Sequence, residues 1–335
     1  MTKKVLCIIT VLLILIYVMA SCDKDDHNDV DNTPQGSIGL EYVLASDEES
    51  YSVQMGTCTD TDIIIPSHHN GKPVTSIADK GFEMCKSITS VTIPDTVTSI
   101  GAYAFQVCHA LESITITNSV TSIGEAAFYN CLALKSIVIP DSVTTLGKKA
   151  FYNCESMTNA TVGIGIERIE EQTFMDCESL TTIILPDSLK MLGVSAFQGC
   201  KSLTIIDLPD ALTAIWDQAF LGCESLTSIK IPDGISTISS QTFFGCKALT
   251  NVTIGKGVDT IESYAFKYCT ALKEIVIPKN VTYLQKYAFL GCSWPQFKIY
   301  CETPAKPIFW SEYWNCSDDY HPNLFQYTVT WGYTS

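Results

Sequence analysis

The chain has 335 residues, 46% hydrophobic content and a formal net charge of −15 at pH 7. The acidic balance argues against nucleic acid as a partner, because a nucleic-acid-binding protein needs a basic face. Such a surface instead favours solubility and repels anionic partners at low salt.

The first 21 residues have the pattern of a secretory signal. Two lysines precede an apolar run over residues 5–20, and small residues follow it. The run is about long enough to span a membrane, which makes a membrane anchor one alternative. The stretch "VMASC", residues 18–22, resembles the bacterial lipobox, which is cut before a lipidated cysteine. This resemblance implies that Cys22 is the acylated N-terminus and holds the chain at a membrane; an ordinary signal peptide is the other interpretation.

Residues 22–37 are predicted to form a disordered acidic tether. The segment "CDKDDHNDVDN", residues 22–32, is rich in acidic residues and has almost no apolar ones. The "DKDD" after the cysteine resembles the surface-export signal of lipoproteins in some Gram-negative bacteria. That resemblance implies exposure outside the cell, whereas a plain linker would fit a lipoprotein that faces the periplasm.

Residues 38–73 are predicted to be an N-terminal cap for the repeats that follow. "LEYVLA" and "YSVQMG" flank the turn-like "SDEES", which is a hairpin pattern. A repeat array needs a cover over its end to stay soluble. Cys58 lies in this cap and is predicted to be buried.

Residues 74–300 are built from about ten repeats. A phenylalanine stands three residues before each repeated cysteine, and aliphatic residues stand eight and eleven before it. A fixed period of this size predicts a solenoid, in which each unit buries its apolar side only against its neighbours. The cysteines recur every 23 residues: Cys85, Cys108, Cys131, Cys154, Cys177, Cys200, Cys223, Cys246, Cys269 and Cys292.

The ten cysteines are predicted to pack as small core residues. Free cysteine is among the most buried residue types, and a structural zinc site needs about four clustered ligands. A ladder with one thiol per unit offers no such cluster. Neighbouring strands lie within disulfide range, so disulfides or a metal remain the alternative.

Each repeat has three legs. "SLTSIKIP", residues 225–232, predicts a strand, "DGISTIS" a turn with a second extended leg, and "SQTFFGC" a tight helical or 3-10 turn. The recurring "IPxSVTxIGxxAFxxCxxLxxIxI" resembles the BspA-type leucine-rich repeat over residues 60–300. The resemblance implies a curved, right-handed, β-rich solenoid with a parallel sheet on its concave side. It also implies a surface or secreted protein of the kind that adheres to host matrix proteins or other cells.

Residues 301–335 are predicted to be a C-terminal cap. The segment 292–301 reads as one residue short of the repeat, and the sequence beyond it loses the pattern. Trp310 and Trp314 are expected to cover the end of the core, since aromatic side chains bury large areas. The alternative is a ligand-stacking surface. Cys301 and Cys316 are a candidate disulfide in an exported protein.

Side chains alternate between the core and the concave face along each predicted strand. The outward set is mostly hydroxyl-bearing, with scattered charge and a few aliphatic residues such as Val138, Ile184 and Ile205. It can dock an extended protein surface, although a solvated sheet without a ligand is the simpler alternative. The candidate interaction face is Thr89, Ser90, Thr92, Glu112, Ser113, Thr115, Lys135, Ser136, Thr158, Asn159, Thr181, Thr182, Thr204, Asp207, Thr227, Ser228, Lys230, Thr250, Asn251, Lys273 and Glu274.

The motifs give no support to an enzyme or to a cofactor. The sequence has neither a Gly-x-Ser-x-Gly elbow nor a His-Glu-x-x-His pair. We therefore expect a lipid-anchored outer-membrane protein that binds macromolecules, such as host or neighbouring-cell proteins. A glycan-capturing lipoprotein that uses Trp310 and Trp314, and a periplasm-facing envelope scaffold, are the alternatives. The sequence sets no oligomeric state.

Overall fold

The structure is a computed structural model, and it describes residues 36–293, 295–316 and 326–334. Contacts divide the chain into Met1–Pro34 and Gln35–Ser335. The predicted signal segment, the lipidation candidate Cys22 and the predicted tether up to residue 35 lie outside the described residues.

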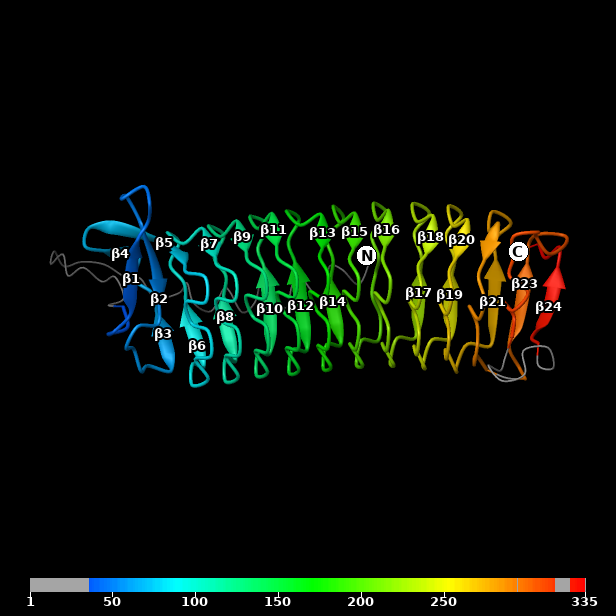
Figure 1. Cartoon of the computed structure of the whole chain (residues 1–335), viewed down its shortest axis with the longest axis horizontal. Helices are drawn as coiled ribbons and strands as arrows, with labels where there is room; N and C mark the ends of the chain where they lie inside the picture. The colour runs from blue at the N-terminus through cyan, green and yellow to red at the C-terminus, as the bar shows by residue number, and fades with distance from the viewer. Residues whose placement is uncertain (1–35, 294, 317–325, 335) are drawn as a thin grey trace, which may run out of the picture. The chain divides into compact units, whose positions relative to one another are not determined.

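In Gln35–Ser335, successive repeats form successive coils, most of which contain two short strands (Figure 1). Strands of neighbouring coils pair in parallel with an offset of one repeat, as Ser136 does with Asn159. The predicted leucine-rich-repeat solenoid is confirmed, with about eleven turns.

The first strand of each coil belongs to a ladder that we call the first ladder. Its alternating pattern gives alternating burial, as in Ser136–Ile139, where the two isoleucines are buried and the other two residues are exposed. The ladder divides into four sheets. Its strands are β3 (Asp62–Ile64), β6 (Ser90–Thr92), β8 (Ser113–Thr115), β10 (Ser136–Ile139), β12 (Asn159–Val162), β14 (Thr182–Ile184), β17 (Ser228–Lys230), β19 (Asn251–Thr253), β21 (Glu274–Ile277), β23 (Lys298–Cys301) and β24 (Thr328–Trp331).

The second strand of each coil belongs to the second ladder, which is also parallel. Most of these strands have two residues, of which the second is a buried aliphatic. They are β2 (Tyr51–Gln54), β5 (Lys72–Ile77), β7 (Ser99–Ile100), β9 (Ser122–Ile123), β11 (Thr145–Leu146), β13 (Arg168–Ile169), β15 (Met191–Leu192), β16 (Ala214–Ile215), β18 (Thr237–Ile238), β20 (Thr260–Ile261) and β22 (Tyr283–Leu284).

The predicted N-terminal hairpin is confirmed. β1 (Glu41–Leu44) pairs antiparallel with β2, and the two-residue β4 (His68–His69) folds back on β5. Cys58 is buried, as expected, and its N–H bonds to the carbonyl of Met55 three residues earlier. Cys85 bonds to Phe82 in the same way, so this segment already follows the path of a coil.

The third leg is a run of tight turns, and the described residues contain no helix. Alternate N–H groups explain why. In one coil, the N–H groups of Tyr103, Phe105 and Val107 bond to carbonyls of the next coil, while those between them bond three residues back. A helix would keep all of these bonds within the leg. Tyr103 and Val107 have φ values of 58° and 63°, and the same two positions are left-handed in each of the ten repeats.

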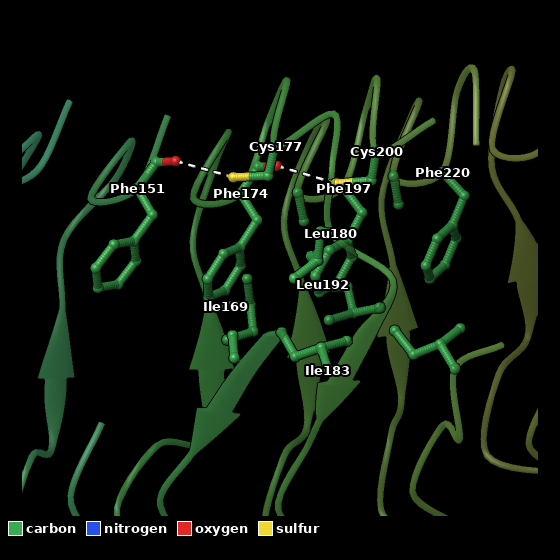
Figure 2. Close-up of a cluster of buried hydrophobic side chains, with 14 of the residues drawn as sticks. Phe151, Ile169, Phe174, Cys177, Leu180, Ile183, Leu192, Phe197, Cys200 and Phe220 are labelled. Atoms are coloured by element: carbon green, nitrogen blue, oxygen red, sulfur yellow. Dashed lines mark hydrogen bonds between the residues drawn. The ribbon is translucent and has the colours of Figure 1, made fainter. Parts of the chain in front are cut away.

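The core is a stack of phenylalanine rings with aliphatic ladders beside it (Figure 2). From Phe82 to Phe289, successive ring centroids lie 5.2–5.6 Å apart and their planes differ by 1–12°. All ten rings are fully buried. Each ring contacts only the rings before and after it, which is the nearest-neighbour packing expected of a solenoid.

The C-terminal segment differs from the expectation in two ways. β23 pairs with β21 at an offset of 24, since Glu274 lies opposite Lys298, so this repeat is one residue longer than the others rather than shorter. The chain beyond it continues along the solenoid path. β24 adds a parallel strand to β23, and Trp310 forms a parallel bridge with Leu284 in the second ladder.

Candidate protein-binding face

Each repeated cysteine except the first donates its thiol to the coil before it. The Sγ atoms lie 3.0–3.3 Å from the carbonyl oxygen of the preceding coil's phenylalanine. Figure 2 shows two of these bonds, from Cys177 to Phe151 and from Cys200 to Phe174. Such a carbonyl also accepts a backbone N–H, as that of Phe174 does from Cys177. The thiol therefore satisfies a second lone pair of a buried carbonyl.

Burial also makes these thiols unreactive. It raises the pKa of Cys108 to about 12 and raises that of Cys131 and Cys246 well above the ordinary value. The thiolate is the nucleophile and the metal ligand, so a thiol held protonated is inert. The ladder cysteines are free thiols. The described residues hold no group of three or more His, Cys, Asp or Glu placed to bind a metal.

The candidate face from the sequence lies on the outer side of the first ladder, and we call it the strand face. Thr89, Ser90 and Ser228 are partly exposed there, and the other candidate residues are all exposed. Parallel pairing aligns them in rows, such as Ser136, Asn159 and Thr182. Lys135 and Glu112, from the third and second coils of the face, form an exposed ion pair of 3.6 Å.

Many hydroxyls of the strand face already have a structural role. Five threonines, one in each of five successive coils, donate Oγ1–H to the carbonyl of the corresponding residue one coil earlier, over 2.9–3.5 Å. These are Thr158, Thr181, Thr204, Thr227 and Thr250. Their hydroxyl protons are used within the ladder, so their presence alone does not indicate a ligand.

The distinctive part of the strand face is apolar. Val138, Ile184 and Ile205 have exposed fractions of 59%, 51% and 52%. Val138 and Ile184 lie in one row, on either side of Thr161. Ile205 lies one coil beyond Ile184 and corresponds in sequence to Thr182, in the neighbouring row. For brevity we call Val138, Ile184 and Ile205 together the apolar row. These three side chains are the large exposed hydrophobic residues of the strand face, and a partner that covered them would remove apolar surface from water.

The first ladder is interrupted beside the apolar row. β14 and β17 belong to separate sheets, and residues 203–209 between them form no strand (Figure 1). Ile205 lies in this segment, one coil from Ile184. Backbone that is not paired in a sheet offers hydrogen-bonding groups to a partner, so apolar and polar groups are available together here.

Trp310 and Trp314 are core residues, and the alternative that they form a stacking surface for a ligand is wrong. Each is only 3% exposed. Their ring centroids lie 4.8 Å apart, and Trp310 Nε1 donates to the carbonyl of Val281 over 3.2 Å. Trp310 occupies the next place after Leu284 in the second ladder, where a large apolar ring covers the last coil.

Cys301 and Cys316 are both buried and are not joined by a disulfide, although both belong to the described part of the chain. Cys301 ends β23 opposite Ile277, and Cys316 forms an isolated bridge with Gln326. Burial raises the pKa of Cys301 to about 12. Cys301 thus packs inward like the ladder cysteines.

Two exposed aromatic residues near the C-terminal end were not singled out from the sequence. Tyr283 and Phe309 are 48% and 58% exposed. The available signal was that Tyr283 stands where all earlier repeats have a non-aromatic residue.

Over the ranges the structure covers, we find no helix of the length and hydrophobicity that crossing a bilayer requires.

Several solved structures are similar to this chain. A leucine-rich cell surface protein from Faecalibacterium prausnitzii is 25% identical with a TM-score of 0.55, and the match covers 91% of this chain and 97% of that one. A leucine-rich repeat protein from Bacteroides ovatus is 23% identical (TM-score 0.42, 86% and 90% covered), and one from T. pallidum is 24% identical (TM-score 0.42, 70% and 88% covered). No curated protein matches the chain.

The family comparison covers most of the chain. The model of the BspA type leucine rich repeat region matches residues 75–204 and 190–304, with six copies. Together these ranges include all ten repeated cysteines. This match agrees with the 23-residue coils and the phenylalanine stack of the structure. The chain therefore belongs to the BspA-type leucine-rich repeat family.

Proposed function

We propose that this chain is a lipid-anchored protein of the outer cell surface that binds other proteins, in adhesion to host or neighbouring cells, and that it has no catalytic role. Membership of the BspA-type family supports a role in protein interaction, and the similar Faecalibacterium protein is described as a cell surface protein. The signal pattern and Cys22 support lipid anchoring from the sequence side.

The apolar row carries the proposal. Val138, Ile184 and Ile205 are each at least half exposed on a face that is otherwise polar. Full burial of an exposed aliphatic side chain is worth about 1.5–3 kcal/mol, so covering the exposed half of each of these residues with a protein partner gains roughly half of that. The charged pair Lys135 and Glu112 lies at the rim of this area and favours a partner with a matching polar border.

The matching experiment compares cells that produce the full-length chain with cells that produce variants. Adherence is measured to wells coated with fibronectin, laminin or collagen, and to epithelial cells. The test variant is Val138→Lys, Ile184→Lys and Ile205→Lys. The matched control replaces Ile164 and Val194, which are exposed elsewhere, by lysine.

The proposal predicts that the test variant loses at least about tenfold in adherence, because charge in a desolvated contact is costly, while the control adheres like the native chain. Equal adherence of the test variant and the native chain, at equal surface amounts, would count against the strand face. A periplasm-facing scaffold remains the alternative, and it predicts no adherence by any version.

A further inference from the structure

The second ladder changes character at its C-terminal end. The residue nine before each ladder cysteine is the penultimate residue of a short strand and is at least partly exposed. The residues at this position in the other coils show which side chains the fold accepts there. It is occupied in turn by Ser76, Ser99, Ser122, Thr145, Arg168, Met191, Ala214, Thr237 and Thr260, and then by Tyr283.

Phe309 takes the same place one coil further on. The bridge between Leu284 and Trp310 puts Phe309 beside Tyr283. Their ring centroids lie 5.0 Å apart at 19°, and both rings are about half exposed. The core beneath them is filled by Leu284 and Trp310, so core packing does not require these two rings. An exposed aromatic pair of this kind is typical of a binding surface.

The aromatic pair borders an open cavity of about 590 Å³. This volume lies in the usual range for a small ligand, but most of the other lining groups are polar. Besides Tyr283, Phe309 and the buried Leu284, the lining is Thr260, Ser263, Gln285, Lys286 and Ser311.

Gln285 is held in place for an outside partner. Its Oε1 accepts hydrogen bonds from the N–H and the Oγ–H of Ser263, over 3.2 and 2.9 Å. Among the residues that the structure describes, no group accepts from its Nε2. The side-chain amide therefore has a fixed oxygen and two donor hydrogens for a ligand.

Lys286 supplies a cation without a carboxylate partner in the described part of the chain. Its Nζ lies 6.0 Å from the ring centre of Tyr287, a contact that leaves the ammonium hydrogens for other acceptors. In a chain of net charge −15, such a cation beside an amide and an aromatic pair indicates a ligand that carries an acidic group.

We propose that this cavity is a carbohydrate subsite, in which Tyr283 and Phe309 stack on the apolar face of a pyranose ring and Lys286 binds the carboxylate of an acidic sugar. A pyranose has one face of C–H groups and a rim of hydroxyls. The C–H face matches the aromatic pair, and the hydroxyls match the polar side chains of Gln285, Ser263 and Ser311. A nucleic acid fits poorly, because Lys286 is the single cation in the lining and a phosphate backbone needs several.

This subsite is independent of the strand face, so the two proposals can fail separately. The test uses the full-length chain on a printed array of neutral, uronate-bearing and sialylated glycans. It then uses titration calorimetry with a hyaluronan hexasaccharide, which contains glucuronate, and with neutral chitohexaose. The test variant is Tyr283→Ala with Phe309→Ala. The matched control is Trp216→Ala, which removes another ring that is 51% exposed.

We expect the native chain and the Trp216→Ala control to bind acidic glycans, and the double variant to lose at least about tenfold in affinity, because it lacks both rings on which the sugar stacks. Lys286→Gln should reduce the preference for hyaluronan over chitohexaose at least about threefold while stacking persists. Circular dichroism checks that each variant is folded. The proposal is overturned if the native chain binds no glycan on the array, or if the double variant binds as the native chain does.

Discussion

Mild alkali should unfold this solenoid, because its core is lined with thiols that cannot ionise while they are buried. Eight ladder cysteines are at most 3% exposed and have a pKa raised by burial: Cys108, Cys131, Cys154, Cys200, Cys223, Cys246, Cys269 and Cys292. In the unfolded chain the same thiols titrate near their ordinary pKa of 9.0. The folded pKa lies above the unfolded one. The contribution to stability is therefore complete below about pH 9 and is lost as the pH rises toward the folded value.

The expected size follows from these pKa values. At about pH 10 an unfolded thiol is about 90% ionised, which lowers the free energy of unfolding by about 1.4 kcal/mol per protected thiol. Eight such thiols together lower it by about 11 kcal/mol, which is comparable with the whole stability of an ordinary domain. Local opening of individual coils reduces the cooperative part of this loss, but its direction is the same.

The assay is urea unfolding at about pH 8 and about pH 10 under reducing conditions, followed by circular dichroism and by thiolate absorbance. The matched variant is Cys154→Ala with Cys200→Ala, which has two protected thiols fewer. The loss of unfolding free energy between about pH 8 and about pH 10 should be smaller in this variant than in the native chain, by about 2.7 kcal/mol in total. Equal stability at the two pH values would refute the reasoning. So would thiolate absorbance near pH 9 that accounts for the eight buried thiols while the fold is intact.

Three other outcomes follow from the same coils. Phe174→Ala should lower the free energy of unfolding by about 3–5 kcal/mol, and hydrogen exchange should rise mainly in the adjoining coils; a uniform rise along the array would contradict nearest-neighbour packing. Val107→Asn should stabilise the chain by about 1 kcal/mol, because Val107 is left-handed at φ 63° and Asn tolerates that region better; a lower melting temperature would count against this. Cys85, the partly exposed first rung, should be alkylated in the native state well before Cys223, as mass spectrometry of the labelled peptides can establish; equal labelling would mean that the core is open.

The sequence was sufficient to predict the solenoid, because the core residues occupy the same positions in each repeat. Phenylalanine, cysteine and two aliphatic positions recur every 23 residues, and a buried ladder is the simplest structure that uses them. The outward residues of the strand face followed from the two-residue period of a strand, and the structure leaves all of them at least partly exposed. Neither step required knowledge of contacts between distant residues.

The ends of the array could not be predicted as well, because their residues depart from the repeat. Cys58 precedes Cys85 by 27 residues rather than 23, because this segment has an extra loop. The altered spacing breaks the repeat pattern, although the backbone around Cys58 already follows the path of a coil. Trp310 replaces an aliphatic residue in the second ladder, and spacing alone does not reveal that the chain returns to that ladder. A tryptophan in a cap fits either a buried or a ligand-facing position, and only the packing of the last coil decides between them.

The left-handed turns were also beyond the sequence. Gly199, Gly222, Gly245 and Gly291 mark the residue before the cysteine in four coils, but Val107 occupies the same place with φ 63°. A β-branched residue carries no signal for that conformation. The bond from its N–H to the carbonyl of Tyr129 in the next coil holds it there, and the corresponding residue makes the same bond in the other repeats from Cys85 to Cys269.

The most direct test of the central proposal, that the repeats act outside the cell, is protease treatment of intact cells that produce the full-length chain. An antibody to residues 60–300 detects what remains, and a periplasmic protein serves as the control for unbroken cells. The account predicts that the antibody signal is lost from intact cells while the control protein survives. Full protection of the repeats until the outer membrane is opened would contradict it, and would favour an envelope scaffold that faces the periplasm.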